Sequence, residues 1–156
     1  MAVYNKVGLI DRASVFKKII DRTITSLDEI DFGDIIEIRQ GALSYCTELT
    51  DVVLPNTIQY INHEAFEHCT SLTSIILPES ILGMYMWCFG DCSSLTSVTV
   101  LATTPPDAPY SSNTMFSNTP IAAGTGYIYV PADSVDAYKS ARGWRDYASQ
   151  IRAIQE

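Results

Sequence analysis

The chain has 156 residues, which is enough for one domain with a sizeable core and too few for two ordinary domains. With 47% hydrophobic and 18% charged residues, it has the composition of a folded chain and not of a disordered one. Ten basic residues against 18 acidic ones leave a formal net charge of -8, and no basic cluster interrupts this balance, so nucleic acid is excluded as a partner.

Residues 1–34 predict an N-terminal cap followed by a degenerate first repeat. Between Asp11 and Ile24 apolar residues recur at helical spacing, which indicates a short amphipathic helix over that repeat. Met1 to Ile10 hold no apolar run of signal-peptide length, and no later stretch reaches the roughly 18 apolar residues of a membrane span. We therefore expect neither ordinary export nor membrane insertion, and the localisation stays open.

One apolar pattern then occurs three times at intervals of 23 residues. The copies read Leu43-x-x-Cys46-x-x-Leu49-x-x-Val52-x-Leu54-Pro55, then Phe66-x-x-Cys69-x-x-Leu72-x-x-Ile75-x-Leu77-Pro78, then Phe89, Cys92, Leu95, Val98 and Val100 with Leu101 in place of the proline. A fixed period of this size is typical of a solenoid, in which stacked repeats bury a core that no single repeat can bury. We expect these repeats to extend over residues 35–131.

Each repeat predicts one short strand, because β-branched residues alternate near the end of its pattern. The strands are expected at residues 52–54, 75–77 and 98–100, stacked as a parallel sheet with a spacing of about 4.8 Å. Val52 and Leu54, with their equivalents, should point into the core, whereas the residue between them, Val53, should point outward.

Three of the four cysteines, Cys46, Cys69 and Cys92, share one repeat position, and Cys88 takes the place of an alanine. Side chains at one repeat position run parallel, whereas a tetrahedral zinc site needs four converging ligands. We therefore expect buried free thiols that act as small hydrophobic groups, with no metal and no disulfide.

The last repeat is irregular over residues 102–127. Four residues are inserted around the proline-rich stretch Thr103 to Tyr110, which should bulge from one edge because proline cannot join a ladder. Residues 132–156 then predict a C-terminal cap, with a short helix that Gly143 ends and with Trp144 packed over the last repeat.

The two histidines do not indicate catalysis. His63 and His68 are both expected to face solvent, without a partner in the next repeat. No nucleophile, base and orienting acid can be placed in mutual reach, and no two carboxylates are singled out at catalytic separation. We expect no catalytic residue, no cofactor and no enzyme activity.

Residues 65–78, with the pattern Ala-Phe-x-x-Cys-x-x-Leu-Thr-x-Ile-x-Leu-Pro, resemble the BspA-like leucine-rich repeat family. The run from Thr119 to Pro131 and the aromatic residues after it resemble the closing segment of many such proteins. The resemblance implies a single α/β solenoid of leucine-rich repeats, with short parallel strands and helical caps at both ends.

The resemblance also implies a role in binding, since such domains occur in bacterial surface adhesins and in bacteriophage or prophage proteins encoded near tail genes. The missing signal peptide favours a phage tail-associated module for host recognition, whose ligand would be a protein or glycan of the bacterial envelope. The alternative is a structural component of a virion that contacts only other virion proteins. A homo-oligomer is compatible with both.

The third repeat carries three large side chains where the other repeats are polar. Tyr85, Met86 and Trp87 align with Arg39-Gln40-Gly41 and with Asn62-His63-Glu64. Large exposed apolar groups commonly mark an interface, and aromatic faces stack on sugar rings. Two interpretations are open: these residues form a contact surface together with Tyr110, or the proline-rich stretch folds over them and buries them.

A second candidate surface is the outward face of the predicted sheet. Val53, Ile76, Thr99 and Tyr129 make a mildly apolar stripe on it. The stripe would suit a partner or a neighbouring subunit, and an ordinary sheet surface is the alternative.

Overall fold

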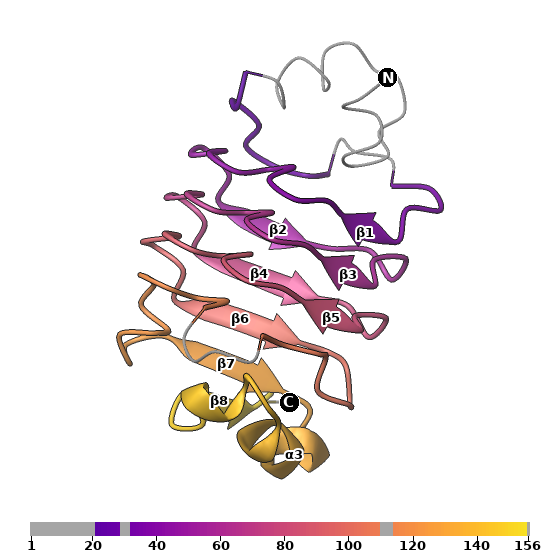
Figure 1. Ribbon diagram of the computed structural model, residues 1–156, viewed down its shortest axis with the longest axis vertical. Helices are drawn as coiled ribbons and strands as arrows, with labels where there is room; N and C mark the ends of the chain where they lie inside the picture. The colour runs from indigo at the N-terminus through magenta and orange to yellow at the C-terminus, as the bar shows by residue number, and fades with distance from the viewer. Residues whose placement is uncertain (1–20, 29–31, 110–113, 156) are drawn as a thin grey trace.

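The structure is a computed structural model, which describes residues 21–28, 32–109 and 114–155. Most of the predicted N-terminal helix lies outside these residues, as does Tyr110. The described chain winds through stacked repeats, and a short helical segment followed by a final strand lies at the far end of the stack (Figure 1).

One sheet contains five parallel strands. In spatial order they are β2 (Asp51–Val53), β4 (Ser74–Leu77), β6 (Ser97–Val100), β7 (Tyr127–Val130) and β8 (Ile151–Ala153). Val52 pairs with Ile75, and Ile75 pairs with Val98, so the register joins residues that are one 23-residue period apart. The predicted parallel strands are therefore confirmed to within a residue at their ends.

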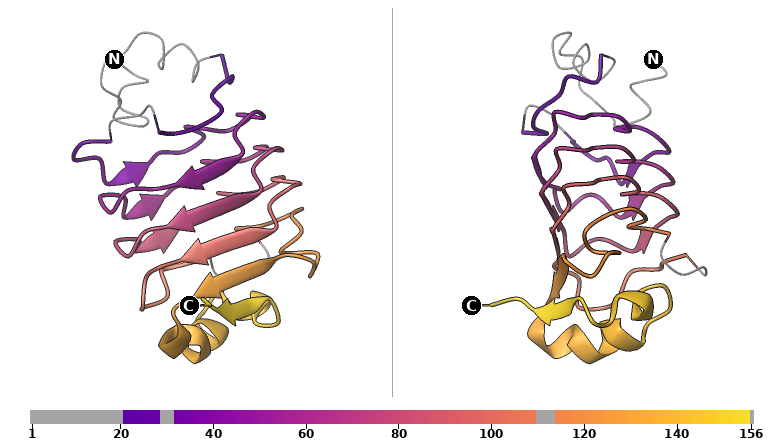
Figure 2. Two further views of the ribbon diagram at one scale, coloured as in Figure 1. Left: turned by 180° about the vertical axis from the view of Figure 1, so that it is seen from behind. Right: turned by 90° about the vertical axis from the view of Figure 1, so that its left-hand side faces the viewer.

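A second parallel sheet contains the strands β1 (Glu37–Ile38), β3 (Tyr60–Ile61) and β5 (Gly83–Met84), in that order. It faces the first sheet across the repeats (Figure 2). Our expectation of one strand per repeat was therefore wrong. Each of these strands is two residues long, which is too short for an alternating pattern to show in the sequence.

The hydrophobic core lies between the two sheets and repeats with the chain. Phe66, Phe89 and Phe116 are fully buried, and their rings stack with centroids 5.2 and 5.7 Å apart. Burying a side chain of this size stabilises a fold by about 1.5–3 kcal/mol relative to leaving it exposed. Phe66 and Phe89 are each covered by the ring of the next repeat, and Phe116 meets the ring of Tyr147 in the C-terminal segment, so this gain requires the stack.

One turn position of every repeat has a left-handed backbone. Tyr45, His68, Asp91 and Asn118 occupy it, with φ angles of 61°, 58°, 56° and 57°. The N–H of His68 donates to the carbonyl of Gly90 in the following repeat at 2.9 Å, and the N–H of Asp91 donates to that of Ser117 at 2.9 Å. These bonds fix the turns relative to one another, so their side chains leave the stack in similar directions.

The C-terminal segment begins with the 3-10 turn η1 (Ala132–Ser134) and the helix α3 (Val135–Ser140), and continues with the 3-10 turn η2 (Arg145–Tyr147). The helix occurs where the sequence predicts it, but the final strand β8 was not predicted. Tyr138, Trp144 and Tyr147 are buried against the core. Among the described residues, no helix has the length and apolar character needed to cross a membrane.

Candidate functional site

The three large residues of the third repeat follow β5 directly and lie where the chain turns away from the second sheet. Trp87 has a φ angle of 60°, and its equivalents Gly41 and Glu64 have angles of 61° and 58°. The turn therefore keeps one backbone shape in all three repeats while the side chains differ. The Trp87 N–H donates to the carbonyl of Thr114 at 2.8 Å, which ties this turn to the irregular repeat.

Met86 and Trp87 differ in exposure. Met86 is 41% exposed, whereas Trp87 is half-buried. The indole packs against Gly90, where an added Cβ would lie 2.6 Å from Cε3 of the ring. Gly90 therefore makes the room that the indole occupies.

Tyr85 is half-buried and faces the proline-rich stretch. It lines a hollow of about 500 Å³. The other lining residues are Pro105, Pro106, Asp107, Ala108, Pro109, Ala141 and Arg142. The ring centroid of His63, one repeat earlier, lies 5.5 Å from that of Tyr85, so the Tyr85 ring also contacts the preceding repeat.

The proline-rich stretch follows the third repeat more closely than predicted. Asp107 donates its N–H to the carbonyl of Leu82 at 2.8 Å and accepts from the N–H of Met84 at 2.9 Å. It thereby forms a bridge with Gly83, beside β5. The expectation that this stretch cannot join a ladder was wrong at Asp107, because that residue has a free N–H among the prolines.

The C-terminal segment holds the other side of this stretch. Gly143, with φ of +76°, approaches so closely that an added Cβ would lie 2.5 Å from Cβ of Ala108. The described part of the stretch thus lies between the third repeat and the C-terminal segment. It lines one side of Tyr85, and Met86 stays exposed.

The second candidate surface has the predicted orientation. Val53, Ile76 and Thr99 pair in register on the outward face of the five-stranded sheet, and Tyr129 follows Thr99. Val53 is 64% exposed, and the other three are half-buried. The row ends at Arg152, whose guanidinium carbon lies 5.0 Å from the ring centroid of Tyr127.

The expectation that both histidines lack partners in the next repeat was wrong. His63 meets Tyr85, as described above. His68 stacks on Tyr45 of the preceding repeat, with centroids 4.4 Å apart, and its Nε2 lies 3.7 Å from Oδ2 of Asp91 in the following repeat. The left-handed turn that Tyr45, His68 and Asp91 share brings these side chains together. In the sequence, the three residues are related only by holding the same position in successive repeats.

Glu67 lies beside this column. Its carboxylate, Nε2 or Nδ1 of His68 and the carboxylate of Asp91 offer ligand atoms that all lie within 4.8 Å of one another. Partial burial, followed by the neighbouring carboxylate of Glu64, raises the pKa of Glu67, although His68 acts in the opposite direction. Sequence reasoning missed this cluster.

The cysteines are buried free thiols, as expected. The thiol of Cys69 donates to the carbonyl of Leu43 at 3.2 Å, and that of Cys92 donates to the carbonyl of Phe66 at 3.1 Å. A hydrogen bond with the Cys92 thiol, followed by burial, raises the pKa of Cys69. Burial also raises the pKa of Cys88 and of Cys46, so these groups stay protonated and unreactive at neutral pH.

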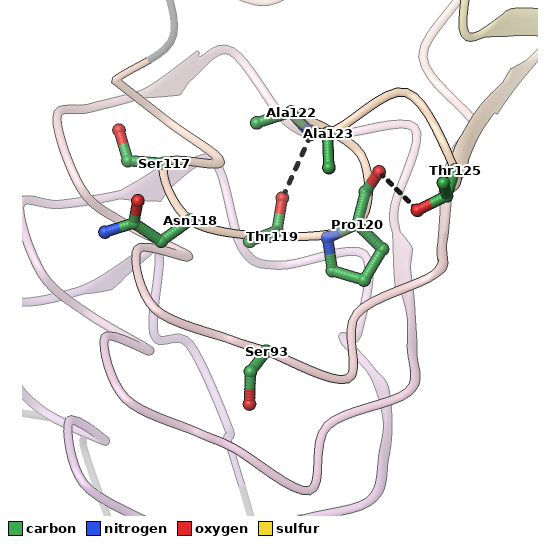
Figure 3. A pocket seen from close by; sticks show the side chains of 8 residues that line it. All are labelled: Ser93, Ser117, Asn118, Thr119, Pro120, Ala122, Ala123 and Thr125. Carbon is green, nitrogen blue, oxygen red and sulfur yellow. Dashed lines mark hydrogen bonds between the residues drawn. The ribbon is translucent and has the colours of Figure 1, made fainter.

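A second hollow, of about 550 Å³, opens at the turns of the last repeat (Figure 3). Its lining residues are Ser93, Ser117, Asn118, Thr119, Pro120, Ala122, Ala123 and Thr125. Two of its hydroxyl groups are engaged locally: that of Thr119 accepts from the N–H of Ala122, and that of Thr125 donates to the carbonyl of Pro120. Because none of the described residues that line it is aromatic or charged, this hollow is a weaker candidate than the one beside Tyr85.

Comparison with protein families agrees with this architecture. The family model described as "BspA type Leucine rich repeat region" matches residues 21–128, with 6 copies. No curated protein matches the chain. The matched residues include both sheets up to the start of β7 and all three large residues of the third repeat.

Proposed function

Because the chain belongs to the BspA-type leucine-rich repeat family, we propose that it is a recognition module whose partner is a protein or glycan of the bacterial envelope. Leucine-rich repeats generally mediate protein binding or recognition, and this family is not a known class of enzymes. The proposed setting is a phage tail or, in second place, a bacterial surface. No cofactor or catalytic group is part of the proposal.

The observation that carries the proposal is the replacement of a polar turn by Tyr85, Met86 and Trp87, of which Tyr85 lines a hollow. An exposed thioether and two half-buried aromatic rings form an amphipathic surface, of the kind that supplies anchors in protein interfaces. Aromatic faces also stack on sugar rings. The prolines of the facing stretch are stiff, so little conformational freedom is lost when a partner binds there.

The row Val53, Ile76 and Tyr129 favours a second function, assembly with other virion proteins or with a second copy of the chain. The 64% exposure of Val53 in the sheet is the specific observation. A mildly apolar sheet face suits a protein partner, because aliphatic side chains such as Val53 and Ile76 gain by being buried against another protein. Its proposed role is structural.

The test compares two sets of variants in binding to envelope fractions of candidate host bacteria and to arrayed glycans. The first set is Met86→Glu and the double variant Tyr85→Ala/Trp87→Ala. The matched control is Val53→Ser/Ile76→Ser, on the other sheet. Circular dichroism and thermal unfolding of every variant separate lost contacts from lost structure.

We expect the first set to weaken binding at least tenfold and the control to leave it unchanged. Loss confined to the control would transfer the site to the sheet face. If the wild-type chain binds no envelope material but binds virion proteins or itself, the assembly function replaces the recognition function.

A further inference from the structure

We propose that Glu67, His68 and Asp91 form a binding site for a divalent transition-metal ion, with Zn²⁺ as the best match. They are the one group of three potential ligands that comes together among the residues the structure describes. The site lies at the turns of two successive repeats. It does not depend on the proposed recognition role.

The separation of the ligand atoms supports an ion between them. Nε2 of His68 and Oδ2 of Asp91 lie 3.7 Å apart, which is too far for a hydrogen bond. Two ligands that each bind Zn²⁺ at about 2.1 Å in a tetrahedral arrangement lie roughly 3.4 Å apart. The spacing of this pair therefore needs only a small adjustment to accept the ion, and a carboxylate oxygen of Glu67 lies within 4.8 Å of a ligand atom on each of the two residues.

Neighbouring groups orient two of the three ligands. The side-chain amide of Asn118 donates to Oδ1 of Asp91 at 2.9 Å, while Oδ2 is the oxygen nearest His68. The ring of Tyr45 stacks on the imidazole at 4.4 Å, with 23° between the planes. Such outer contacts restrict the orientation of metal ligands and support affinity.

The backbone presents the ligands from fixed positions. His68 and Asp91 hold the left-handed turn position of consecutive repeats, and each turn is hydrogen-bonded to the next repeat. The side chain of His68 is 34% exposed and that of Asp91 is 27% exposed. The ligands are thus partly desolvated, and an ion can still reach them from solvent.

The ligand types select the metal. An imidazole nitrogen suits Zn²⁺ and related ions, whereas Ca²⁺ takes six to eight oxygen ligands. Two carboxylates balance the charge of a divalent ion. Three protein ligands leave one position of a tetrahedral ion for water or for a group from a partner.

The test is titration of the full chain with ZnCl₂, after chelator treatment and with its thiols kept reduced, followed by calorimetry. We expect one ion per chain. The variants His68→Asn and Asp91→Asn should weaken Zn²⁺ binding at least tenfold, because a neutral amide is a poorer zinc ligand than imidazole or carboxylate. Asparagine tolerates the left-handed turn, so the backbone should keep its shape. The variant His63→Asn is the matched control and should bind as the wild type does.

A fourth variant, Asn118→Gly, keeps all three ligands and tolerates the left-handed turn, and it should weaken binding about tenfold because Asp91 loses the hydrogen bond that orients it. Binding of Co²⁺ gives a second readout, because thiolate ligands produce an intense near-ultraviolet charge-transfer band that nitrogen and oxygen ligands do not. Absence of stoichiometric Zn²⁺ binding would overturn the proposal. Unchanged affinity in His68→Asn and Asp91→Asn, or a thiolate band, would do the same.

Discussion

Trp144 donates its indole N–H to the backbone carbonyl of Pro106, with 2.8 Å between nitrogen and oxygen. The Trp144 side chain is completely buried, and its ring meets that of Tyr138 edge-on at 5.1 Å. Pro106 lines the hollow beside Tyr85. One hydrogen bond therefore joins the C-terminal segment to the wall of the candidate surface.

We expect Trp144→Phe to lower the free energy of unfolding by about 2–4 kcal/mol. The substitution leaves a buried carbonyl without its donor, which costs about 1–3 kcal/mol, and the smaller ring leaves a cavity. Urea unfolding followed by circular dichroism measures the change. The control Trp87→Phe, at a half-buried position, should cost less than about 1 kcal/mol. A Trp144→Phe variant as stable as the wild type would show that this hydrogen bond does not contribute to stability.

Two buried tyrosines provide a matched pair. The hydroxyl of Tyr138 donates to the carbonyl of Ala102 at 2.7 Å, whereas that of Tyr147 is buried without a hydrogen-bond partner in the described part of the chain. We expect Tyr138→Phe to cost about 1–2 kcal/mol of unfolding free energy and Tyr147→Phe to be neutral or stabilising. Both are measured by chemical denaturation under identical conditions. Equal costs would contradict the assignment of the two hydroxyls.

Gly90 and Trp87 should be energetically coupled. Because an added Cβ would lie 2.6 Å from the indole, Gly90→Ala must displace the ring and should cost about 1–3 kcal/mol. A Trp87→Ala background removes the closest contact, the indole ring, and leaves only the position-87 carbonyl oxygen and Cβ at 3.3 and 3.4 Å. The same substitution should therefore cost at least about 0.5 kcal/mol less there, since coupling between residues in contact is usually about 0.5–3 kcal/mol. A double-mutant cycle from urea unfolding gives the coupling. Additive effects would mean that the turn relaxes without strain.

The repeat pattern predicted the sheet that contains β2, β4 and β6 because the same core residues recur at a constant spacing. Val52, Ile75 and Val98 have one environment, so one period describes all three. The insertion of four residues in the last repeat was also readable, and it explains why Asn118 follows Asp91 by 27 residues and still holds the same turn. The two-residue strands of the second sheet carried no such signal.

The candidate surfaces were only partly readable. The departure from pattern at Tyr85 is visible in an alignment of the repeats, but its position beside Pro106 depends on where Trp144 and Gly143 hold the proline-rich stretch. The cluster around His68 was missed for a different reason. Tyr45, His68 and Asp91 share a backbone conformation and no side-chain chemistry, so a comparison of residue types does not group them.

The buried thiols should make the fold less stable at alkaline pH. The pKa of Cys69 and that of Cys88 are raised in the folded chain, so the folded state keeps both thiols neutral. The contribution of these two thiols to the free energy of unfolding is fully present below their pKa in the unfolded chain, about 8.5. It is lost as the pH rises above that value, because the unfolded chain then releases protons that the folded chain retains. Between pH 7 and pH 9.5 each thiol should lower the free energy of unfolding by about 1.4 kcal/mol, and the two together by about 3 kcal/mol.

Urea unfolding at pH 7, 8.5 and 9.5, with a reductant present, measures this loss. The variant Cys88→Ala is the matched control, because Ala42 and Ala65 hold the same repeat position and are equally buried. It removes one titrating thiol, so its loss of stability between pH 7 and pH 9.5 should be smaller than that of the wild type by about 1.4 kcal/mol. Changes in surface charge affect both proteins alike and cancel in the comparison. Equal pH dependence of the two proteins would show that Cys88 ionises as readily in the folded chain as in the unfolded one.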